Sequence, residues 1–415
     1  MKMSNTKIVK PRHQRFVNVA AFLLGPIIRH KLGYKSPHIN VKAHEPFIVV
    51  SNHVTAFDPI LLTLTFRRQV YYVSSELIFS KGLISRMLEY TFSPIPKSKS
   101  QTDITSVKTM IQVTKEGGNV GVFVEGNSTI TGTISNVPAA IGKLVLLLKL
   151  PLIIFNFEGG YLSNPRWASA KRKRHIRGHI RQILHYEDYK NLSADAINEL
   201  IIQGINVNAY EENPPYEYHG KHNAEGLHRL LFSCPKCHEV NTIKTHGNTY
   251  SCLNCGFKMT YDSQGYLSSP DFSTKKTTIE LDLDNKRHYQ ETVLKDPDFK
   301  ISVTAKMSEV FRRRRKRFGM ATLTLSRRGL EVDFKRKNIQ NSHFTLDELD
   351  TMAMQQKEVL VIYPRNEQTK MALIANTERV SAYQFIITLQ ILKNELMCQE
   401  KGEPIKPLTL TEMGL

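Results

Sequence analysis

Short apolar runs alternate with amphipathic stretches along the first half of the chain. Three largely apolar runs, at residues 47–50, 119–124 and 151–154, are typical of strands buried on both faces of a sheet. Between them, apolar residues recur at helical spacing in two segments, 104–118 and 138–149. Strands that alternate with helices predict an α/β domain.

A later segment of the same half has a different pattern. Residues 175–183 alternate polar and apolar side chains, which predicts an edge strand with one face in water. The architecture expected for this half is therefore a mixed sheet flanked by helices.

The second half of the chain is richer in strands. Residues 321–334 predict a β-hairpin, and further strands are expected near 358–363 and 370–375. A closing helix is expected from about 378 to 395, because apolar residues recur there on one side. The order of these elements resembles a pleckstrin-homology-like barrel, and it predicts a C-terminal α+β domain.

Changes in composition divide the chain into six parts. The boundary after the first domain is placed at a Glu-Glu-Asn-Pro-Pro segment, which ends a helical region. The expected parts are a basic, interfacial segment (1–44), an α/β domain (45–213), a linker (214–230), a cysteine-bearing ribbon (231–268), a β-rich domain with a closing helix (269–400) and a tail (401–415).

The chain is strongly basic, with 57 Lys and Arg against 38 Asp and Glu and a formal net charge of +19 at pH 7. An anionic partner is expected: membrane headgroups, coenzyme A phosphates or nucleic acid. Residues 1–44 contain nine Lys or Arg and no acidic residue, around the largely apolar stretch 16–28. The densest basic run is 312–317. A solvated loop is the alternative there, but six like charges repel one another and favour an anionic surface.

The apolar stretch 16–28 is too short to cross about 30 Å of hydrocarbon as a straight helix. We expect it to lie in the membrane interface, with a broken helical hairpin that dips into the bilayer as the alternative. A secretory signal has a similar basic start and apolar middle, but no Ala-x-Ala-like cleavage site follows Ile28. The expected location is the cytoplasmic face of the cell membrane, as a peripheral or monotopic protein.

Four of the five cysteines form two Cys-x2-Cys pairs with fourteen residues between the pairs. They are Cys234, Cys237, Cys252 and Cys255. This spacing is typical of a zinc ribbon, in which four thiolates hold a structural Zn²⁺ and no position remains for catalysis. Two disulfides are the first alternative, which a cytoplasmic setting disfavours, and a rubredoxin-like iron site is the second.

Candidate chemistry begins directly after the first apolar run. His53 and Asp58 are five residues apart at the end of a predicted strand, where a loop can fold the carboxylate onto the imidazole. An imidazole held in this way can act as a general base toward a hydroxyl near neutral pH. The alternative is structural, because Asp58 followed by Pro59 is also typical of a helix N-cap with a first-turn proline.

The residues around this pair resemble the signature blocks of a known family. Asn52, His53 and Asp58 match Asn-His-x4-Asp, the first block of the glycerolipid acyltransferases related to 1-acylglycerol-3-phosphate acyltransferase. Segments 95–97, 122–129 and 150–154 follow in the order of the second, third and fourth blocks. The resemblance covers roughly residues 15–210 and does not extend to the second half.

The resemblance implies an O-acyltransferase that moves a fatty acyl group from acyl-CoA or acyl carrier protein to a hydroxyl of a lysophospholipid, with 1-acylglycerol-3-phosphate as a candidate acceptor. It implies catalytic roles for His53 as the base and Asp58 as its partner. The residues that it implies for substrate binding are Asn52, Lys97, Glu125, Gly126, Asn127 and Ser128.

Two departures from the family pattern affect the acceptor. Lys97 stands where the family has arginine, and Asn127-Ser128 stand where it has threonine and arginine. A bidentate guanidinium clamp on a phosphate is therefore weakened, since lysine offers a single point charge and serine none. Acceptors with a phosphodiester or sugar headgroup are expected to compete with lysophosphatidic acid. Lys97 as an ordinary solvated surface charge is the alternative.

Two other classes of protein share some of these features. A zinc-ribbon nucleic-acid-binding protein would explain the charge, the ribbon and the arginine run, but it leaves the blocks around His53 and Glu125 unexplained. A non-catalytic lipid-binding scaffold would keep the fold without turnover. The expected partners are an anionic membrane surface, a lysolipid acceptor and an acyl thioester donor, which includes acyl carrier protein. Nucleic acid is not expected.

Overall fold

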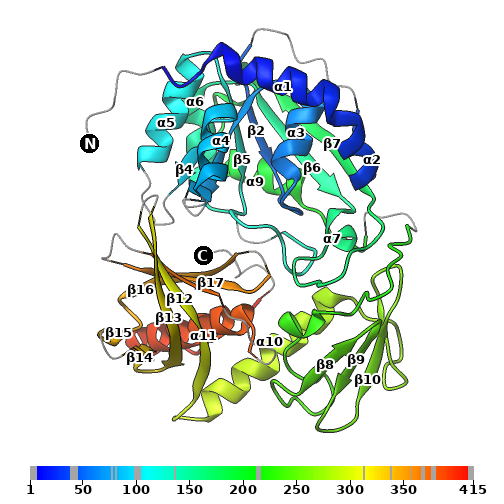
Figure 1. Ribbon diagram of the computed structural model, residues 1–415, viewed down its shortest axis with the longest axis vertical. Coiled ribbons are helices and arrows are strands. Elements are labelled where there is room, and N and C mark those ends of the chain that lie inside the picture. Colours follow the sequence, from blue (N-terminus) through cyan, green and yellow to red (C-terminus); the bar gives the residue numbers. More distant parts are fainter. Residues whose placement is uncertain are drawn as a thin grey trace. The chain divides into compact units, whose positions relative to one another are not determined.

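The structure is a computed structural model, and the chain divides in it into two compact units (Figure 1). Unit 1 comprises Met1–Ser163 and Lys173–Tyr216, and unit 2 comprises Asn164–Arg172 and Glu217–Met413. The residues that the structure describes are 7–37, 45–75, 78–79, 82–97, 104–134, 137–211, 216–311, 314–336, 339–355, 357–365, 370–374 and 380–409.

The described part of unit 1 is built on a seven-stranded sheet with the order β1-β7-β6-β2-β5-β3-β4. The five strands from β6 to β4 are mutually parallel, β7 is antiparallel to β6, and β1 is parallel to β7. The expected mixed sheet is therefore confirmed. The strands are β1 (Tyr34–Lys35), β2 (Ile48–Ser51), β3 (Val70–Ser75), β4 (Ile95–Lys97), β5 (Asn119–Phe123), β6 (Leu152–Glu158) and β7 (Ile176–Leu184).

The position of β7 differs from the expectation of an edge strand. It lies second from the edge, because Tyr34 and Lys35 of β1 pair with its first two residues. A two-residue strand carries too little pattern to be found from the sequence, so the alternation of β7 pointed to the wrong position in the sheet.

Helices cover both faces of this sheet (Figure 1). Ile48 and Val50 of β2 face one core, whereas Val49 faces the other. The first core is completed by α5, α6 and α9, and the second by α2 and α3. The helices of unit 1 in the described residues are α1 (Pro11–Leu23), α2 (Gly25–Leu32), α3 (Asp58–Phe66), α4 (Leu83–Thr91), α5 (Ile104–Lys115), α6 (Ala140–Leu148), α7 (Gly160–Ser163), α8 (Tyr186–Tyr189) and α9 (Ala194–Ile205).

The apolar N-terminal stretch forms two helices, α1 and α2, that meet at Leu24. Pro26 lies in the first turn of α2, where backbone N–H groups have no partner within the helix, so the missing N–H of proline costs no hydrogen bond. The second helix ends at Gly33, whose φ of 56° is left-handed and suits glycine. In the described part of the chain, no helix combines the length and the apolar character needed to cross a membrane.

Unit 2 contains two antiparallel sheets in its described residues. The smaller has the order β11-β10-β9-β8, with Cys252 at the end of β9, and the larger has the order β15-β14-β13-β12-β18-β17-β16. The strands are β8 (Ile243–His246), β9 (Thr249–Cys252), β10 (Lys258–Tyr261), β11 (Leu267–Ser268), β12 (Lys300–Phe311), β13 (Arg314–Ser326), β14 (Gly329–Phe334), β15 (Ser342–Phe344), β16 (Leu349–Gln355), β17 (Val359–Pro364) and β18 (Lys370–Ile374).

Two long helices, α10 (Thr278–Lys295) and α11 (Ala382–Lys401), complete unit 2. The predicted hairpin is formed by β13 and β14, and the closing helix α11 starts and ends later than expected. Antiparallel strands with a closing helix confirm the predicted C-terminal α+β region. Its resemblance to a pleckstrin-homology-like barrel stays a prediction. In the basic run, residues 314–317 belong to β13, whereas Arg312 and Arg313 lie outside the described residues.

Candidate active site

The strand ends of the sheet bring the first and third sequence blocks together. Neighbours β5, β2 and β6 are parallel, and Ser51 at the end of β2 pairs with Phe123 and with Phe155. His53 follows β2 by two residues, and Glu125 follows β5 by two residues. Both side chains therefore reach the carboxyl-terminal edge, which is where open α/β sheets bind their ligands.

His53 and Asp58 form a hydrogen-bonded pair at this edge. The distance from Nδ1 of His53 to Oδ2 of Asp58 is 2.8 Å. The carboxylate is fully buried, while 19% of the imidazole surface is exposed. Because Asp58 engages Nδ1, the nitrogen that can exchange a proton with a ligand is Nε2.

Asp58 also closes the loop that carries His53. Its Oδ2 accepts the backbone N–H groups of Val54 at 2.7 Å and Thr55 at 2.9 Å, and its Oδ1 accepts the Thr55 hydroxyl at 2.6 Å. These bonds satisfy a carboxylate that would be costly to bury alone. The N-cap position of α3 is Phe57, without a side-chain bond, so the Asp58 carboxylate faces the loop and does not cap the helix.

The imidazole of His53 packs against an aromatic wall. Its ring stacks on Phe123 with 4.6 Å between the centroids, and Phe123 stacks in turn on Tyr72 at 5.7 Å. The main chain of His53 is fixed as well, because its N–H donates to Oε1 of Glu125 at 2.8 Å and its C=O accepts from the N–H of Thr129 at 2.8 Å. The third block therefore positions the histidine of the first block.

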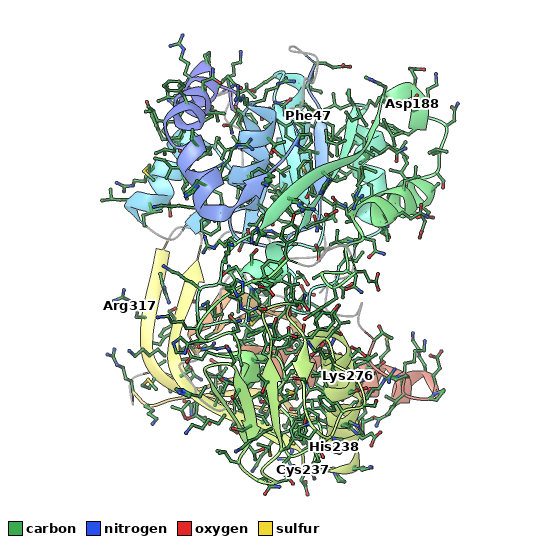
Figure 2. All side chains as sticks on the ribbon, turned by 90° about the vertical axis from the view of Figure 1, so that its right-hand side faces the viewer. Phe47, Asp188, Cys237, His238, Lys276 and Arg317 are labelled. Atoms are coloured by element: carbon green, nitrogen blue, oxygen red, sulfur yellow. The ribbon has the colours of Figure 1, made fainter. Side chains whose placement is uncertain are left out.

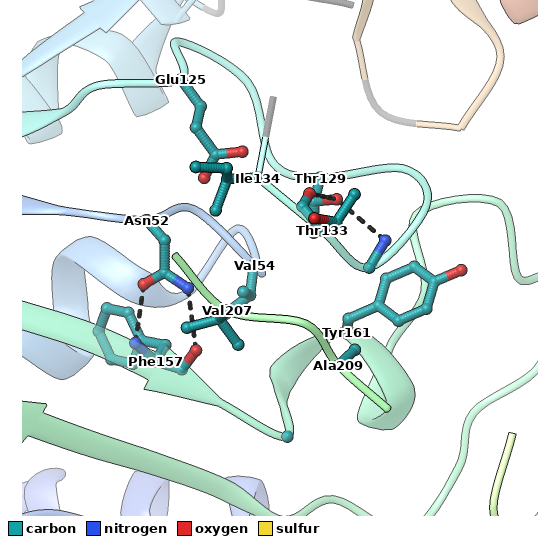
Figure 3. A pocket seen from close by; sticks show the side chains of 12 residues that line it. Asn52, Val54, Glu125, Thr129, Thr133, Ile134, Phe157, Tyr161, Val207 and Ala209 are labelled. Carbon is teal, nitrogen blue, oxygen red and sulfur yellow. Dashed lines mark hydrogen bonds between the residues drawn. The ribbon is translucent and has the colours of Figure 1, made fainter. Parts of the chain in front are cut away.

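Asn52 is engaged within the protein. Its Oδ1 accepts the N–H of Phe157 at 2.7 Å and its Nδ2 donates to the C=O of Phe157 at 2.9 Å (Figure 3). The amide thus ties the loop after β2 to the end of β6. These contacts give Asn52 a role in positioning the loop, and its contact with substrate stays a prediction.

A small cavity, lined by Asn52 and Val54 of the histidine loop, lies between the loops that follow β2, β5 and β6 (Figure 3). Its volume is about 10 Å³, roughly the space for one water molecule, so it does not hold an acyl chain in this conformation. The lining residues are Asn52, Val54, Glu125, Thr129, Gly132, Thr133, Ile134, Phe157, Gly159, Tyr161, Val207 and Ala209.

The remaining residues implied for substrate binding are more distant or more exposed. Lys97 is exposed at the end of β4, three strands from β2, which corresponds to about 14 Å across the sheet. Gly126 is exposed with a φ of 69°, and Asn127 and Ser128 are half-buried in the same loop. The structure brings the third-block loop to the His53–Asp58 pair and leaves Lys97 at the rim of the sheet.

Several residues of the site had no role assigned from the sequence. Thr55 supplies two bonds to Asp58, Phe123 forms the stacking surface, and Tyr161 lines the cavity. The Gly159-Gly160 pair in the sequence could have indicated a close approach of the backbone to another part of the site. A Cβ on Gly160 would meet Cγ2 of Val54 at 2.4 Å, so α7 contacts the histidine loop through its backbone.

The four paired cysteines form a candidate metal centre in unit 2. Their Sγ atoms all lie within 4.8 Å of one another, with 3.7 Å between Cys234 and Cys255 and 3.8 Å between Cys237 and Cys252. All four are free thiols, not disulfides. The N–H of Lys236 points to the sulfur of Cys234 at 3.4 Å, as is usual where a thiolate is bound in a knuckle. The donor set fits one tetrahedral Zn²⁺.

A buried carboxylate that orients a partly exposed imidazole, at the ligand-binding edge of an α/β sheet, defines an acid–base site. Residues 36–157, which include this pair, match the family model described as Acyltransferase. The segment that holds His53 and Asp58 is therefore similar to the acyltransferase family.

Comparison with solved structures gave likenesses of low identity. The 1-acyl-sn-glycerophosphate (LPA) acyltransferase PlsC from Thermotoga maritima is 16% identical over 46% of this chain and 79% of that chain, with a TM-score of 0.39. Two structures of Vav1 are 9% and 11% identical over 28% of this chain, with TM-scores of 0.19 and 0.16. The matches span only 38% and 37% of those Vav1 chains. No curated protein matches the chain.

Proposed function

We propose that the protein is an O-acyltransferase that moves a fatty acyl group from a thioester donor, acyl-CoA or acyl carrier protein, to a hydroxyl of a lysophospholipid. The observation that carries this proposal is the His53–Asp58 pair, with its carboxylate fully buried and its imidazole partly exposed, inside a segment that is similar to the acyltransferase family. The similarity of the sequence blocks to glycerolipid acyltransferases supports a lipid acceptor.

The proposed reaction needs one base and no covalent enzyme intermediate. Nε2 of His53 takes the proton of the acceptor hydroxyl as the oxygen attacks the thioester carbonyl. The negative charge of Asp58 stabilises the imidazolium that forms, and the main-chain bonds to Glu125 and Thr129 hold the ring in place. The tetrahedral intermediate then expels the thiolate, the C–S bond breaks, and the imidazolium returns its proton to sulfur. The products are an ester and a free thiol.

This function is tested by incubating the purified chain with acyl-CoA or acyl carrier protein and a panel of lysolipids, followed by mass spectrometry of the lipids. We expect one lysolipid class to gain an acyl ester while free thiol accumulates. Nucleic-acid binding without acyl transfer would favour the zinc-ribbon alternative. Lipid binding without turnover in any combination would favour the scaffold.

Exposed apolar side chains on α1, α2 and α4 support a membrane location, which we propose to be the cytoplasmic face. The exposed side chains are Phe16, Val19, Phe22 and Leu23 on α1, Leu24 and Ile27 at the start of α2, and Leu83, Ile84, Met87 and Tyr90 on α4. The helices α1 and α4 pack together, with Phe16 against Phe92 at 5.3 Å and the Arg12 guanidinium 4.0 Å from the Tyr90 ring. An apolar face beside basic residues suits an anionic bilayer surface.

The double variant Phe22→Asp/Leu83→Asp is expected to weaken binding to vesicles that contain anionic lipid by tenfold or more. These two side chains are 81% and 80% exposed, so they are the most available for insertion, and their replacement also adds negative charge. Vesicle co-sedimentation at low and high salt measures the effect. Leu147→Asp, on α6 at the opposite face of the sheet, is the matched control and should bind normally. Equal loss in both variants would contradict the proposed membrane face.

The basic end of hairpin β12–β13 is a second candidate contact with an anionic surface. Arg315, Lys316 and Arg317 are exposed near the end of the hairpin, and Figure 2 labels Arg317 there. Lys316 lies 5.2 Å from the ring of Phe318. We propose that these residues contribute electrostatic attraction to anionic lipids, which high salt should screen.

Acceptor choice is expected to respond to Ser128. Introducing Ser128→Arg should shift preference toward lysophosphatidic acid by about 1–3 kcal/mol if a charge-assisted hydrogen bond to the phosphate forms. The ratio of kcat/KM for lysophosphatidic acid and a phosphodiester lysolipid measures this, with Ser128→Gln as the uncharged control. A wild-type chain that strictly requires lysophosphatidic acid would show that other basic residues already supply the clamp. Lys99, a candidate for that role, lies outside the described residues.

A further inference from the structure

One segment of the chain leaves unit 1 and returns to it. Asn164–Arg172, between α7 and β7, belongs to unit 2, whereas Ser163 before it and Lys173 after it belong to unit 1. We call Asn164–Arg172 the strap. The chain therefore passes between the units at both ends of the strap, in addition to the passage after Tyr216.

Inside unit 2, the strap is held by aromatic and charged contacts. Trp167, the single tryptophan of the chain, is fully buried and meets the edge of Tyr261 with 5.7 Å between ring centroids. The Arg172 guanidinium is 5.1 Å from the Trp167 ring and 4.6 Å from the Tyr261 ring. It donates to the Tyr261 hydroxyl at 3.0 Å and to the C=O of Asn223. An arginine held between two rings fixes the end of the strap to its middle and to Tyr261.

Further hydrogen bonds anchor the middle of the strap. Arg229 donates to the C=O of Trp167 at 2.9 Å and to the hydroxyl of Ser169 at 2.7 Å, and the N–H of Ser169 donates to the C=O of Glu225 at 2.8 Å. Tyr261 connects this anchor to the metal centre, because β10 ends at Tyr261 and pairs with β9, which ends at Cys252.

In unit 1, the residues before the strap form a wall of the candidate active site. Gly159 and Tyr161 line the cavity, and the backbone of Gly160 lies against Val54 in the histidine loop. Ser163 holds the residues on both sides of the strap close together, since its Oγ accepts the N–H of His175 at 2.8 Å. Ser163 is joined directly to Asn164, the first residue of the strap.

From this arrangement we infer that the strap positions α7, and through it the loop of His53, for acyl transfer. Trp167 and Arg172 act as positioning residues, because they contact unit 2 and not the reacting groups. The zinc ribbon then affects the rate of acyl transfer by holding the strap, although none of its residues contacts the reacting groups. The kinetic part of this inference rests on the proposed acyl transfer, whereas the structural part does not.

The structural part is tested by hydrogen exchange in the full-length, zinc-loaded protein. In Trp167→Ala we expect the N–H of Ser163, which bonds to the C=O of Gly159, to exchange at least tenfold faster, while amides of α5 stay protected. Tyr261→Phe removes only the hydroxyl that Arg172 contacts, and it should give a smaller acceleration in the same peptide. Zinc content near one per chain confirms that unit 2 is folded. Unchanged exchange at α7 in both variants would overturn the inference.

The sole tryptophan gives a second structural measurement. Removing the metal with a chelator should shift the Trp167 emission to longer wavelength and accelerate exchange at α7, because Tyr261 ends β10, which pairs with β9, the strand that ends at Cys252. Loss of the metal with an unchanged Trp167 emission would show that the strap anchor is independent of the ribbon and would overturn the link to it.

Kinetics test the consequence for the reaction. Trp167→Ala and Arg172→Ala should lower kcat by about tenfold with KM changed less than twofold, since a displaced wall misplaces the base more than it weakens binding. Arg172→Lys should recover part of the loss. The control is Arg327→Ala, another partly buried arginine of unit 2, which bonds to Glu395 and not to the strap. An equal kcat loss in that control would overturn the positioning role, whereas a wild-type protein without acyl transfer would refute the proposed function and leave the exchange result to decide.

Discussion

Replacing His53 with alanine is expected to lower the rate of acyl transfer by about 10²–10⁴-fold, because the imidazole is the base that takes the hydroxyl proton in the proposed reaction. Folding should be retained, since the imidazole is partly exposed and makes one side-chain hydrogen bond, to Asp58. Steady-state rates with thioester and lysolipid measure the loss, and the melting temperature and vesicle binding serve as controls. A variant that keeps more than a tenth of the wild-type rate would exclude His53 as the base.

Asp58→Asn should separate the charge of the carboxylate from its packing. The amide oxygen can accept the same three bonds, from His53, Val54 and Thr55. The amide nitrogen, which replaces Oδ1, can donate to the Thr55 hydroxyl, whereas Oδ1 accepted the bond from that hydroxyl. The fold is therefore expected to survive, while the rate falls on the order of 10²-fold or more because a neutral amide stabilises the imidazolium poorly.

The Asp58→Asn result has a clear structural alternative. If Asp58 served only to close its loop, the melting temperature would collapse and the residual folded protein would keep its kcat. Thr55→Ala is the matched control, because it removes one bond to the carboxylate without changing its charge. We expect that variant to lose less than tenfold in rate.

The purified chain is expected to carry about one zinc ion, and the double variant Cys234→Ser/Cys252→Ser should lose it completely. Structural zinc contributes about 10–16 kcal/mol of apparent binding free energy, so unit 2 should lose its cooperative unfolding transition in that variant. Metal analysis and thermal unfolding measure both effects. Cys398→Ser is the matched control, since Cys398 is buried in α11 and lies outside the cluster of four.

Two results would contradict the zinc centre. Iron in stoichiometric amount would favour the rubredoxin-like alternative. A metal-free chain whose four cysteines do not react with thiol reagents would indicate disulfides instead. Acyl transfer should persist at a reduced rate in the zinc-free variant, because the His53–Asp58 pair lies in unit 1.

The parts of unit 1 that could be predicted are those set by local pattern. The apolar runs form β2, β5 and β6, because a short, largely apolar segment is typical of a strand buried on both faces of a sheet. The two amphipathic segments form α5 and α6. His53 and Asp58 were close in sequence, so a single loop was enough to bring them together. Glu125 reached the same edge because parallel neighbouring strands end on the same side.

The features that could not be predicted depend on contacts between distant residues. The amide of Asn52 bonds to Phe157, which is far along the chain, so its positioning role was invisible beside its family match. Residues 171–174 are all basic, which hides the buried position of Arg172 between two aromatic rings. The strap combines a buried tryptophan with a basic surface segment, and only the fold shows which of its residues are inside.

The central claim is tested most directly by following both halves of the thioester in one reaction. A donor with an isotope-labelled acyl chain is mixed with the full-length protein and the lysolipid that the panel selects, and lipids and free thiol are quantified by mass spectrometry. The account predicts one labelled diacyl lipid for each thiol released in the wild type and neither product above background in His53→Ala. Thiol release with labelled free fatty acid and no labelled diacyl lipid would identify a thioesterase, and equal transfer by the two proteins would contradict the assignment of His53.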